Sequence, residues 1–165
     1  MSPSFVVNVA DAPAFEHPVS GVRILFEPPD AEFRDTGINV QVLQPGQPNC
    51  KYHAEGAQED FLVLAGECLA LMDGVERTLR AWDFVHCEPG TPHVFVGAGD
   101  GPCWLLAIGA RREPEELEFP ADDRAARFGA SASRTTTDGD EAYADWAGGP
   151  PPGDAPRVKT PRPPR

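Results

Sequence analysis

The sequence has few cysteines, no long hydrophobic run and few basic residues, and each shortage excludes a class of protein. No apolar run approaches the ~20 residues needed to cross a bilayer. The N-terminal stretch MSPSFVVNVADAP lacks a basic start and a long apolar segment, so we expect no signal peptide. The four cysteines have no C-x-x-C spacing, and without a secretory signal a disulfide framework is not expected. We therefore expect a cytoplasmic protein that does not associate with membranes.

The shortage of basic residues makes the chain strongly acidic. It has 14 Lys and Arg against 26 Asp and Glu, a net charge of −12. Such a surface repels phosphate backbones, so we expect no nucleic-acid partner. The short basic tail, residues 150–165, does not change this interpretation.

Prolines (19) and glycines (16) favour many short elements joined by turns. Between residues 61 and 108, β-type runs alternate with turn signals, and an Asp73-Gly74 pair is typical of a hairpin. The runs are Phe61–Leu64, Glu67–Met72, Val75–Leu79, Phe84–Cys87, His93–Val96 and Trp104–Ile108. Upstream, Phe5–Val9 and Val22–Phe26 are short β-type runs, and Ile38–Leu43 has the polar–apolar alternation of a half-buried strand. The pattern predicts an all-β sandwich or barrel of antiparallel strands.

The sequence changes character after residue 109. Glu113–Glu118 and Asp122–Phe128 are charged and could form single helical turns, and Tyr143 and Trp146 have the i, i+3 spacing that could place both aromatic rings on the barrel. Residues 148–165 contain seven prolines and no apolar face, so we expect a disordered tail. The predicted division is a single domain over 1–147 followed by this tail.

A cluster of polar side chains directly precedes the apolar run Phe61–Leu64. His53, Glu55, Glu59 and Asp60 lie within eight residues. Burying such groups is costly unless a metal or hydrogen bonds compensate, and in an extended chain His53, Glu55 and Glu59 share one face. The alternatives are a strand-edge histidine bonded to backbone, a solvated corner at Glu59 and Asp60, and a Glu55 that turns to solvent. Among the cysteines, Cys50 stands out because it lies three residues before His53.

The region around this cluster resembles the first motif of the cupin family, whose members are small jelly-roll β-barrels. That motif has a glycine, then His-x-His, a glutamate three or four residues on, and a second glycine. The matching residues are Gly46, His53, Glu55, Glu59 and Gly66, with Glu55 in place of the second histidine.

The second cupin motif, Pro-x-Gly-x-x-His after a Gly-Asp pair, resembles the segment from Trp82 to His93. Asp83 keeps the acidic place, Trp82 replaces the glycine, and Pro89 to His93 supply the rest with the proline one residue late. Gly97 occupies the place of the asparagine that usually follows the histidine. The resemblance covers about residues 38–108 and implies an antiparallel jelly-roll β-barrel.

The resemblance also implies a metal site. Carried over residue by residue, it assigns metal ligands to His53, Glu59 and His93, with Glu55 as a further candidate. Such a set suits one divalent ion, with Fe, Mn, Ni and Zn equally acceptable, and occupancy is expected to fall below the histidine pKa of ~6.5.

For function, the resemblance implies a protein that binds or acts on a small molecule, but it designates no catalytic residue. Members of the family carry out dioxygenation, isomerisation, epimerisation and decarboxylation, and the fold favours none of these reactions. The alternative is a non-enzymatic, metal-free cupin that binds a metabolite or has a structural role. Cupins of this kind commonly pair through their outer sheets, so the resemblance also implies a homodimer.

Overall fold

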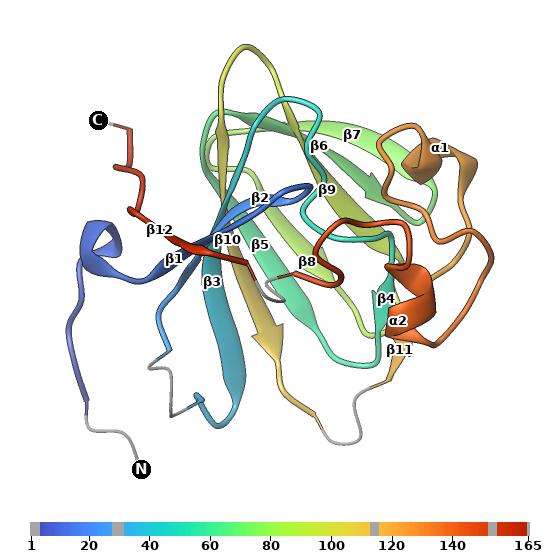
Figure 1. Ribbon diagram of the computed structural model, residues 1–165, viewed down its shortest axis with the longest axis horizontal. Coiled ribbons are helices and arrows are strands. Elements are labelled where there is room, and N and C mark those ends of the chain that lie inside the picture. The colour runs from blue at the N-terminus through green and yellow to red at the C-terminus, as the bar shows by residue number, and fades with distance from the viewer. Residues whose placement is uncertain (1–3, 28–31, 113–115, 152–154, 165) are drawn as a thin grey trace.

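A computed structural model describes residues 4–27, 32–112, 116–151 and 155–164. These residues form an antiparallel jelly-roll in which a seven-stranded sheet accompanies a three-stranded sheet (Figure 1). The strands are β1 (Ala14–His17), β2 (Gly21–Leu25), β3 (Thr36–Leu43), β4 (Ala54–Glu55), β5 (Glu59–Ala65), β6 (Glu67–Met72), β7 (Val75–Arg80), β8 (Phe84–Cys87), β9 (His93–Ala98), β10 (Cys103–Ala110), β11 (Leu117–Glu118) and β12 (Arg157–Val158). The short helices are η1 (Val9–Asp11), α1 (Asp123–Ala126) and α2 (Gly139–Ala142). The predicted all-β jelly-roll with short C-terminal helical turns is confirmed.

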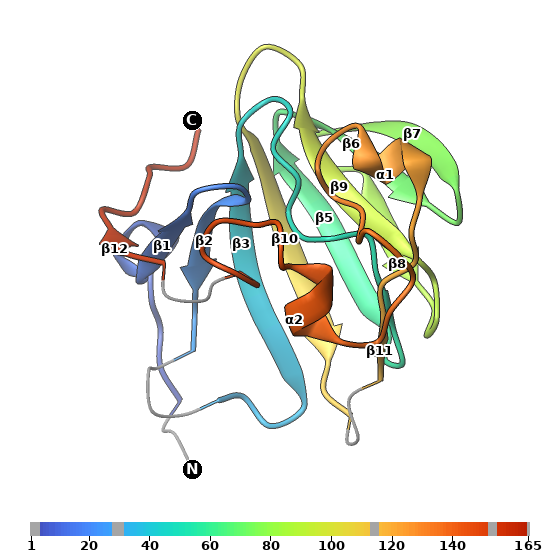
Figure 2. The same cartoon turned by 45° about the vertical axis from the view of Figure 1, so that its right-hand side comes forward.

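The large sheet has the strand order β12-β1-β2-β3-β10-β5-β8, and the small sheet has the order β7-β6-β9. A separate two-stranded pair joins β4, which contains Glu55 of the polar cluster, to β11. Figures 1 and 2 both place α1 beside the three-stranded sheet and β12 at the opposite side, next to β1.

The Asp73-Gly74 hairpin is confirmed between β6 and β7. Both turn residues have positive φ angles, 48° for Asp73 and 70° for Gly74. Two left-handed residues give the two-residue turn whose twist matches that of the flanking strands. The paired strands then keep one register from Glu67 opposite Arg80 to Met72 opposite Val75.

The hydrophobic core lies between the two sheets. It is built from inward side chains of β3 and of β5 to β10, and its largest members include Leu43, Phe61, Phe95 and Leu105. The outer face of the large sheet carries a second cluster, with Ile24, Val40, Val42 and Trp104, covered by residues of the N-terminal segment and by Val158 of β12. Apolar residues therefore cover both faces of this sheet over β10 and at the Leu43 end of β3.

The C-terminal segment with α1 and α2 is fastened to the barrel by a buried lysine. The side chain of Lys51 has no exposed surface, and its Nζ donates to the Gly129 and Ser131 carbonyls at 3.0 and 2.9 Å and contacts the Asp145 carboxylate at 2.7 Å. A buried ammonium needs such a full set of acceptors. Tyr143 and Trp146 are buried beside it, as their spacing predicted.

Two expected elements differ from the structure. Phe5–Val9 forms no strand, and the large sheet takes up β1, which was not among the expected β-type runs. Pro13 directly precedes β1, and its carbonyl accepts the Leu25 N–H. The expected helical turn over Glu113–Glu118 contains β11, because Glu55 and Ala54 offer a pairing edge to Leu117 and Glu118. Residues 113–115 lie outside the described residues.

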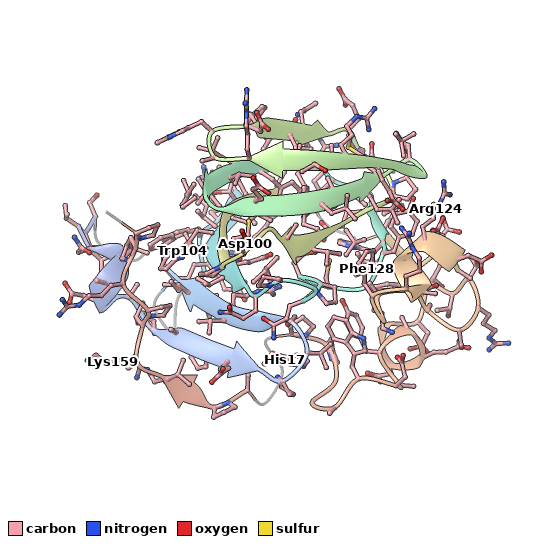
Figure 3. The ribbon with its side chains drawn as sticks, turned by 90° about the horizontal axis from the view of Figure 1, so that it is seen from above. His17, Asp100, Trp104, Arg124, Phe128 and Lys159 are labelled. Carbon is pink, nitrogen blue, oxygen red and sulfur yellow. The ribbon has the colours of Figure 1, made fainter. Side chains whose placement is uncertain are left out.

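The tail is not disordered where the structure describes it, residues 148–151 and 155–164. β12 pairs with β1 through Ala14 opposite Val158, and the Thr160 hydroxyl donates to the Ala12 carbonyl at 2.5 Å. Figure 3 shows Lys159, the residue directly after β12, and the C-terminal strand beside the N-terminal strands. The expectation failed because an open strand edge supplies the backbone partners that the proline-rich composition could not predict.

No helix within the described ranges has the length and hydrophobicity to span a membrane.

Candidate metal centre

A backbone bridge brings two distant histidines side by side. His53 and His93 exchange backbone hydrogen bonds, with N···O distances of 3.2 and 2.8 Å, across an isolated antiparallel bridge. Their rings lie 4.8 Å apart between centroids. Paired residues of antiparallel strands project to the same face, so both imidazoles face the same space between the sheets. Glu59, the first residue of β5, faces them.

The three side chains converge on a common point. His93 Nε2 lies 3.0 Å from Glu59 Oε2, and His53 Nε2 lies 3.7 Å from the same oxygen. One ligand atom from each residue lies within 4.8 Å of the other two. Two imidazoles and one carboxylate at this spacing form a donor set suited to iron, manganese, nickel or zinc.

Each imidazole is held from behind by a backbone carbonyl. His53 Nδ1 lies 2.9 Å from the Lys51 carbonyl oxygen, and His93 Nδ1 lies 2.9 Å from that of Thr91. A carbonyl only accepts, so Nδ1 carries the hydrogen in both rings. In the neutral rings the Nε2 lone pairs therefore point toward Glu59. This is the outer-shell arrangement that orients metal-binding histidines.

Two atoms of the group are buried without a hydrogen-bond partner within the described part of the chain: Glu59 Oε2 and His93 Nε2. Although 3.0 Å apart, they do not meet the geometry of a hydrogen bond, and in the neutral tautomer both are acceptors. Buried polar atoms normally have partners, and adjacent acceptors repel unless a cation lies between them. The residues therefore fit a bound metal ion.

Without a metal, protons take the place of the cation. Burial disfavours a charged His93, but contacts with Cys87 and Glu59 outweigh it and raise the pKa of His93 to about 10. Burial also opposes the charged form of His53, yet Cys50, Glu55 and Glu59 raise its pKa well above the usual value. Burial favours the neutral form of Glu59, but both histidines lower its pKa. The group thus requires positive charge beside the Glu59 carboxylate.

Of the other acidic residues of the sequence cluster, Glu55 lies beside His53 and Asp60 lies away from the group. Glu55 Oε1 is 3.4 Å from His53 Nε2, but Glu55 is not part of the convergent group. Its role as a fourth ligand stays a prediction. Asp60 faces away and pairs with the exposed His86, with Oδ1 2.6 Å from Nδ1. Cys50 lies beside the group, its Sγ 3.5 Å from His53 Nδ1.

A cavity of about 660 Å³ opens in front of the group. Its lining includes His53 and Glu59 together with Arg23, Gln41 and Tyr143. Aromatic rings adjoin the histidines, with Phe119 6.1 Å from His53 and Phe61 5.3 Å from His93 between centroids. The volume is that of a small-molecule site. Another hollow, of about 770 Å³, lies on the C-terminal segment and contains none of the three convergent residues.

Arg23, Gln41 and Tyr143 line the cavity although no sequence pattern predicted this role for them. The alternation in Ile38–Leu43 predicts a half-buried strand but does not say which face is buried, and Gln41 is only 5% exposed and lines the cavity. Its apolar neighbours Val40 and Val42 face the outer cluster instead. The available signal was a single arginine inside the apolar run Val22–Phe26 and a glutamine inside an apolar strand.

The chain can be compared with known protein families, solved structures and curated proteins. Residues 39–109 match a family described as "Cupin domain". Among solved structures, a protein assigned as a sugar phosphate isomerase from Acidithiobacillus ferrooxidans is 25% identical, with a TM-score of 0.54 over 62% of this chain and 71% of that one. A search of curated proteins found no match.

Two further structures share the fold. The polyketide cyclase RemF from Streptomyces resistomycificus is 16% identical, with a TM-score of 0.58 over 68% of this chain and 84% of that one. A predicted oxalate decarboxylase from Thermotoga maritima is 19% identical, with a TM-score of 0.57 over 66% of this chain and 100% of that one.

Proposed function

The chain belongs to the cupin superfamily, and on that premise we propose that it binds one divalent metal ion through His53, Glu59 and His93 and acts on a small molecule in the adjoining cavity. The observation that carries this proposal is the pair of buried atoms without hydrogen-bond partners, Glu59 Oε2 and His93 Nε2. A metal ion between them would satisfy both and would remove the repulsion between two acceptors.

The side chains around the group suit chemistry on a bound substrate. A divalent ion at this place supplies Lewis-acid polarisation of a substrate oxygen. Glu55, whose side chain is 24% exposed and 3.4 Å from His53 Nε2, is placed to hold or accept a proton at the cavity wall. The buried rings of Phe61 and Phe119 lie beside the histidines and form an apolar part of the cavity wall. The similarity to a protein assigned as a sugar phosphate isomerase is consistent with a polar substrate.

The proposal is tested by metal titration against a competing chelator dye. Replacing a ligand, as in His53→Ala, Glu59→Gln or His93→Ala, should weaken metal binding by about tenfold or more. His86→Ala is the matched control, because His86 also contacts two carboxylates but lies outside the group. Glu55→Gln separates its two roles: weakened binding makes it a ligand, and unchanged binding with lost turnover makes it a base. Unchanged binding in all three ligand variants would contradict the proposal.

A second candidate is a metal-free cupin that binds a metabolite without transforming it. The raised pKa of His93 favours it, because a proton on that imidazole also neutralises the Glu59 carboxylate. The metal titration separates the two candidates. If the protein is a metal-free cupin, wild type should bind divalent ions no more tightly than His93→Ala does.

A further inference from the structure

The cavity has a second polar wall that the metal group does not use. Arg23 on β2 and Gln41 on β3 are directly opposite each other in the antiparallel register. Gln41 is also opposite Leu105 of β10, whose side chain belongs to the core between the sheets. Opposed residues project to one face, with Cβ atoms about 5 Å apart. Arg23 and Gln41 therefore both face the cavity, and both line it.

The guanidinium of Arg23 is bonded only to neutral groups among the described residues. Its Nη1 donates to the Pro151 carbonyl at 3.2 Å, and its Nη2 donates to the Asn49 carbonyl at 3.4 Å. No described carboxylate lies within 4.0 Å of it, whereas Arg111, in the same cavity, pairs with Glu27 at 2.9 Å. A guanidinium has five donors in a planar fork that matches a carboxylate or a phosphate. Arg23 thus presents positive charge and unused donors to the cavity.

Gln41 adds an unused acceptor beside this charge. Its side chain is 95% buried, its Nε2 donates to Asn39 Oδ1 at 3.0 Å, and its Oε1 has no partner in the described part of the chain. A buried amide oxygen without a donor costs free energy that a hydroxyl group of a ligand would recover. Gln41 therefore suits a hydroxyl next to the group that Arg23 binds.

Tyr143 completes the wall from the C-terminal segment. Its hydroxyl oxygen accepts the Lys51 backbone N–H at 3.1 Å. Because that bond uses the oxygen as an acceptor, the phenol hydrogen is left to donate. Burial raises the pKa of Tyr143, so the hydroxyl keeps its hydrogen at neutral pH. The wall thus combines one cation, one hydrogen donor and one acceptor.

We propose that Arg23, Gln41 and Tyr143 recognise a small hydroxylated anion, with its carboxylate or phosphate group on Arg23 and Tyr143 and a neighbouring hydroxyl on Gln41. This rests on the proposed function, because the reacting end of the molecule is assigned to the His53, Glu59 and His93 group across the cavity. The cavity volume of about 660 Å³ accommodates such a molecule. A carboxylate and a phosphate present similar oxygens to the guanidinium. One probe of each kind is therefore needed to tell which of them the wall prefers.

The experiment is isothermal titration calorimetry with glycolate and with glycerol 3-phosphate, on metal-loaded and on chelator-treated protein. The Arg23→Gln variant should bind the preferred probe at least about tenfold more weakly than wild type, because a charge-assisted pair is lost. Arg34→Gln is the control: it makes the same charge change at an exposed guanidinium paired with Asp35, outside the cavity. Preference for glycolate assigns a carboxylate, and preference for glycerol 3-phosphate assigns a phosphate. Equal binding in the two arginine variants, or no binding of either probe by wild type, would overturn the inference.

Gln41→Glu provides a test that leaves Arg23 in place. The new carboxylate has nearly the shape of the amide but pairs with Arg23, so it should compete with the anion and abolish binding of both probes. Circular dichroism melting checks that each variant is folded, and Gln41→Glu decides the matter if Arg23→Gln does not fold. Unchanged probe binding by folded Gln41→Glu would also overturn the inference.

The two proposals fail in different ways. Wild type that binds the anions through Arg23 but holds no metal contradicts the proposed function alone. If wild type binds metal but Arg23→Gln binds the anions as tightly as wild type does, this inference alone is contradicted. Elemental analysis of Arg23→Gln, which should keep its metal, completes the distinction.

Discussion

At the scale of single residues, His53 and His93 are each fixed by a carbonyl behind the ring and face one carboxylate in front of it. The orientation comes from backbone contacts and does not depend on the bound cation. The group is therefore ready for either a metal ion or protons, and the two compete.

This competition predicts a pH dependence. In the metal-free chain the pKa of His93 is about 10, above the ~6.5 of an unfolded histidine. Its protonated form therefore contributes stability that is complete below pH ~6.5 and is lost as the pH rises through about 10. The free energy of unfolding of chelator-treated protein, from urea denaturation, should fall between pH 7 and 10 more steeply in wild type than in His93→Gln. An equal fall of the free energy of unfolding with pH in wild type and His93→Gln would contradict this prediction.

The same shift changes the expectation for metal binding. Because the metal needs the neutral imidazole, its affinity should rise with pH up to about 10 instead of levelling off above ~6.5.

Two residues that depart from the cupin pattern, Trp82 and Gly97, fit the local backbone conformation. Trp82, at the place of a glycine, has a φ of 75°, the left-handed conformation that glycine adopts readily. Gly97, at the place of an asparagine, allows a close approach: a Cβ there would lie 2.3 Å from the Gln44 carbonyl oxygen. A side chain at residue 97 therefore does not fit.

The resemblance to the two cupin motifs implied that His53, Glu59 and His93 lie together, as they do in the structure, but it did not predict the opposite wall of the cavity. Alternation along a strand separates two faces without saying which is inside. In β3 the apolar face is covered by the N-terminal segment, so Gln41 is the residue that faces the cavity. That covering depends on tertiary packing, which a local pattern does not contain.

At the scale of elements, strands with a strong local signal were predicted almost to the residue. β6 and β8 match the expected runs, and the turn between β6 and β7 follows from Asp73-Gly74. The missed strands β1, β4, β11 and β12 are two to four residues long. Such short strands exist because a partner edge is available, so their sequences alone do not reveal them.

The docked tail leads to a prediction at this scale. Removing residues 148–165 deletes β12, the Val158 contact with the outer cluster and the Gly149 and Pro151 carbonyls that accept from His17 and Arg23. We expect the thermal midpoint to fall by about 2–4 °C, about 1 kcal/mol for a chain of this length. Calorimetry measures it, and removal of residues 161–165 alone is the control. An unchanged midpoint in the longer deletion would show that the tail adds no stability.

At the scale of the whole molecule, the fold class and the sheet architecture followed from turn spacing and family motifs together. The single-domain boundary at residue 147 and the oligomeric state stay predictions. One surface bears on the oligomeric state: Phe84, the first residue of β8, is 63% exposed, and Trp82, just before that strand, is 74% exposed. β8 is an edge strand of the seven-stranded sheet. Large exposed aromatic side chains at a sheet edge are typical of an interface.

We expect a homodimer that buries this edge. Light scattering should give twice the 17.8 kDa of one chain, and Phe84→Glu should reduce the mass to that of a monomer by placing a charge in the interface. Val75→Glu, at an exposed valine on β7 of the other sheet, is the control. A monomeric wild type would remove this prediction and leave the metal centre unaffected.

The metal centre is tested by the metal content of protein purified without chelator, reloaded with divalent ions and desalted. Inductively coupled plasma mass spectrometry should find one divalent ion per wild-type chain and none in folded His93→Ala. Wild type that holds no more metal than His93→Ala would contradict it.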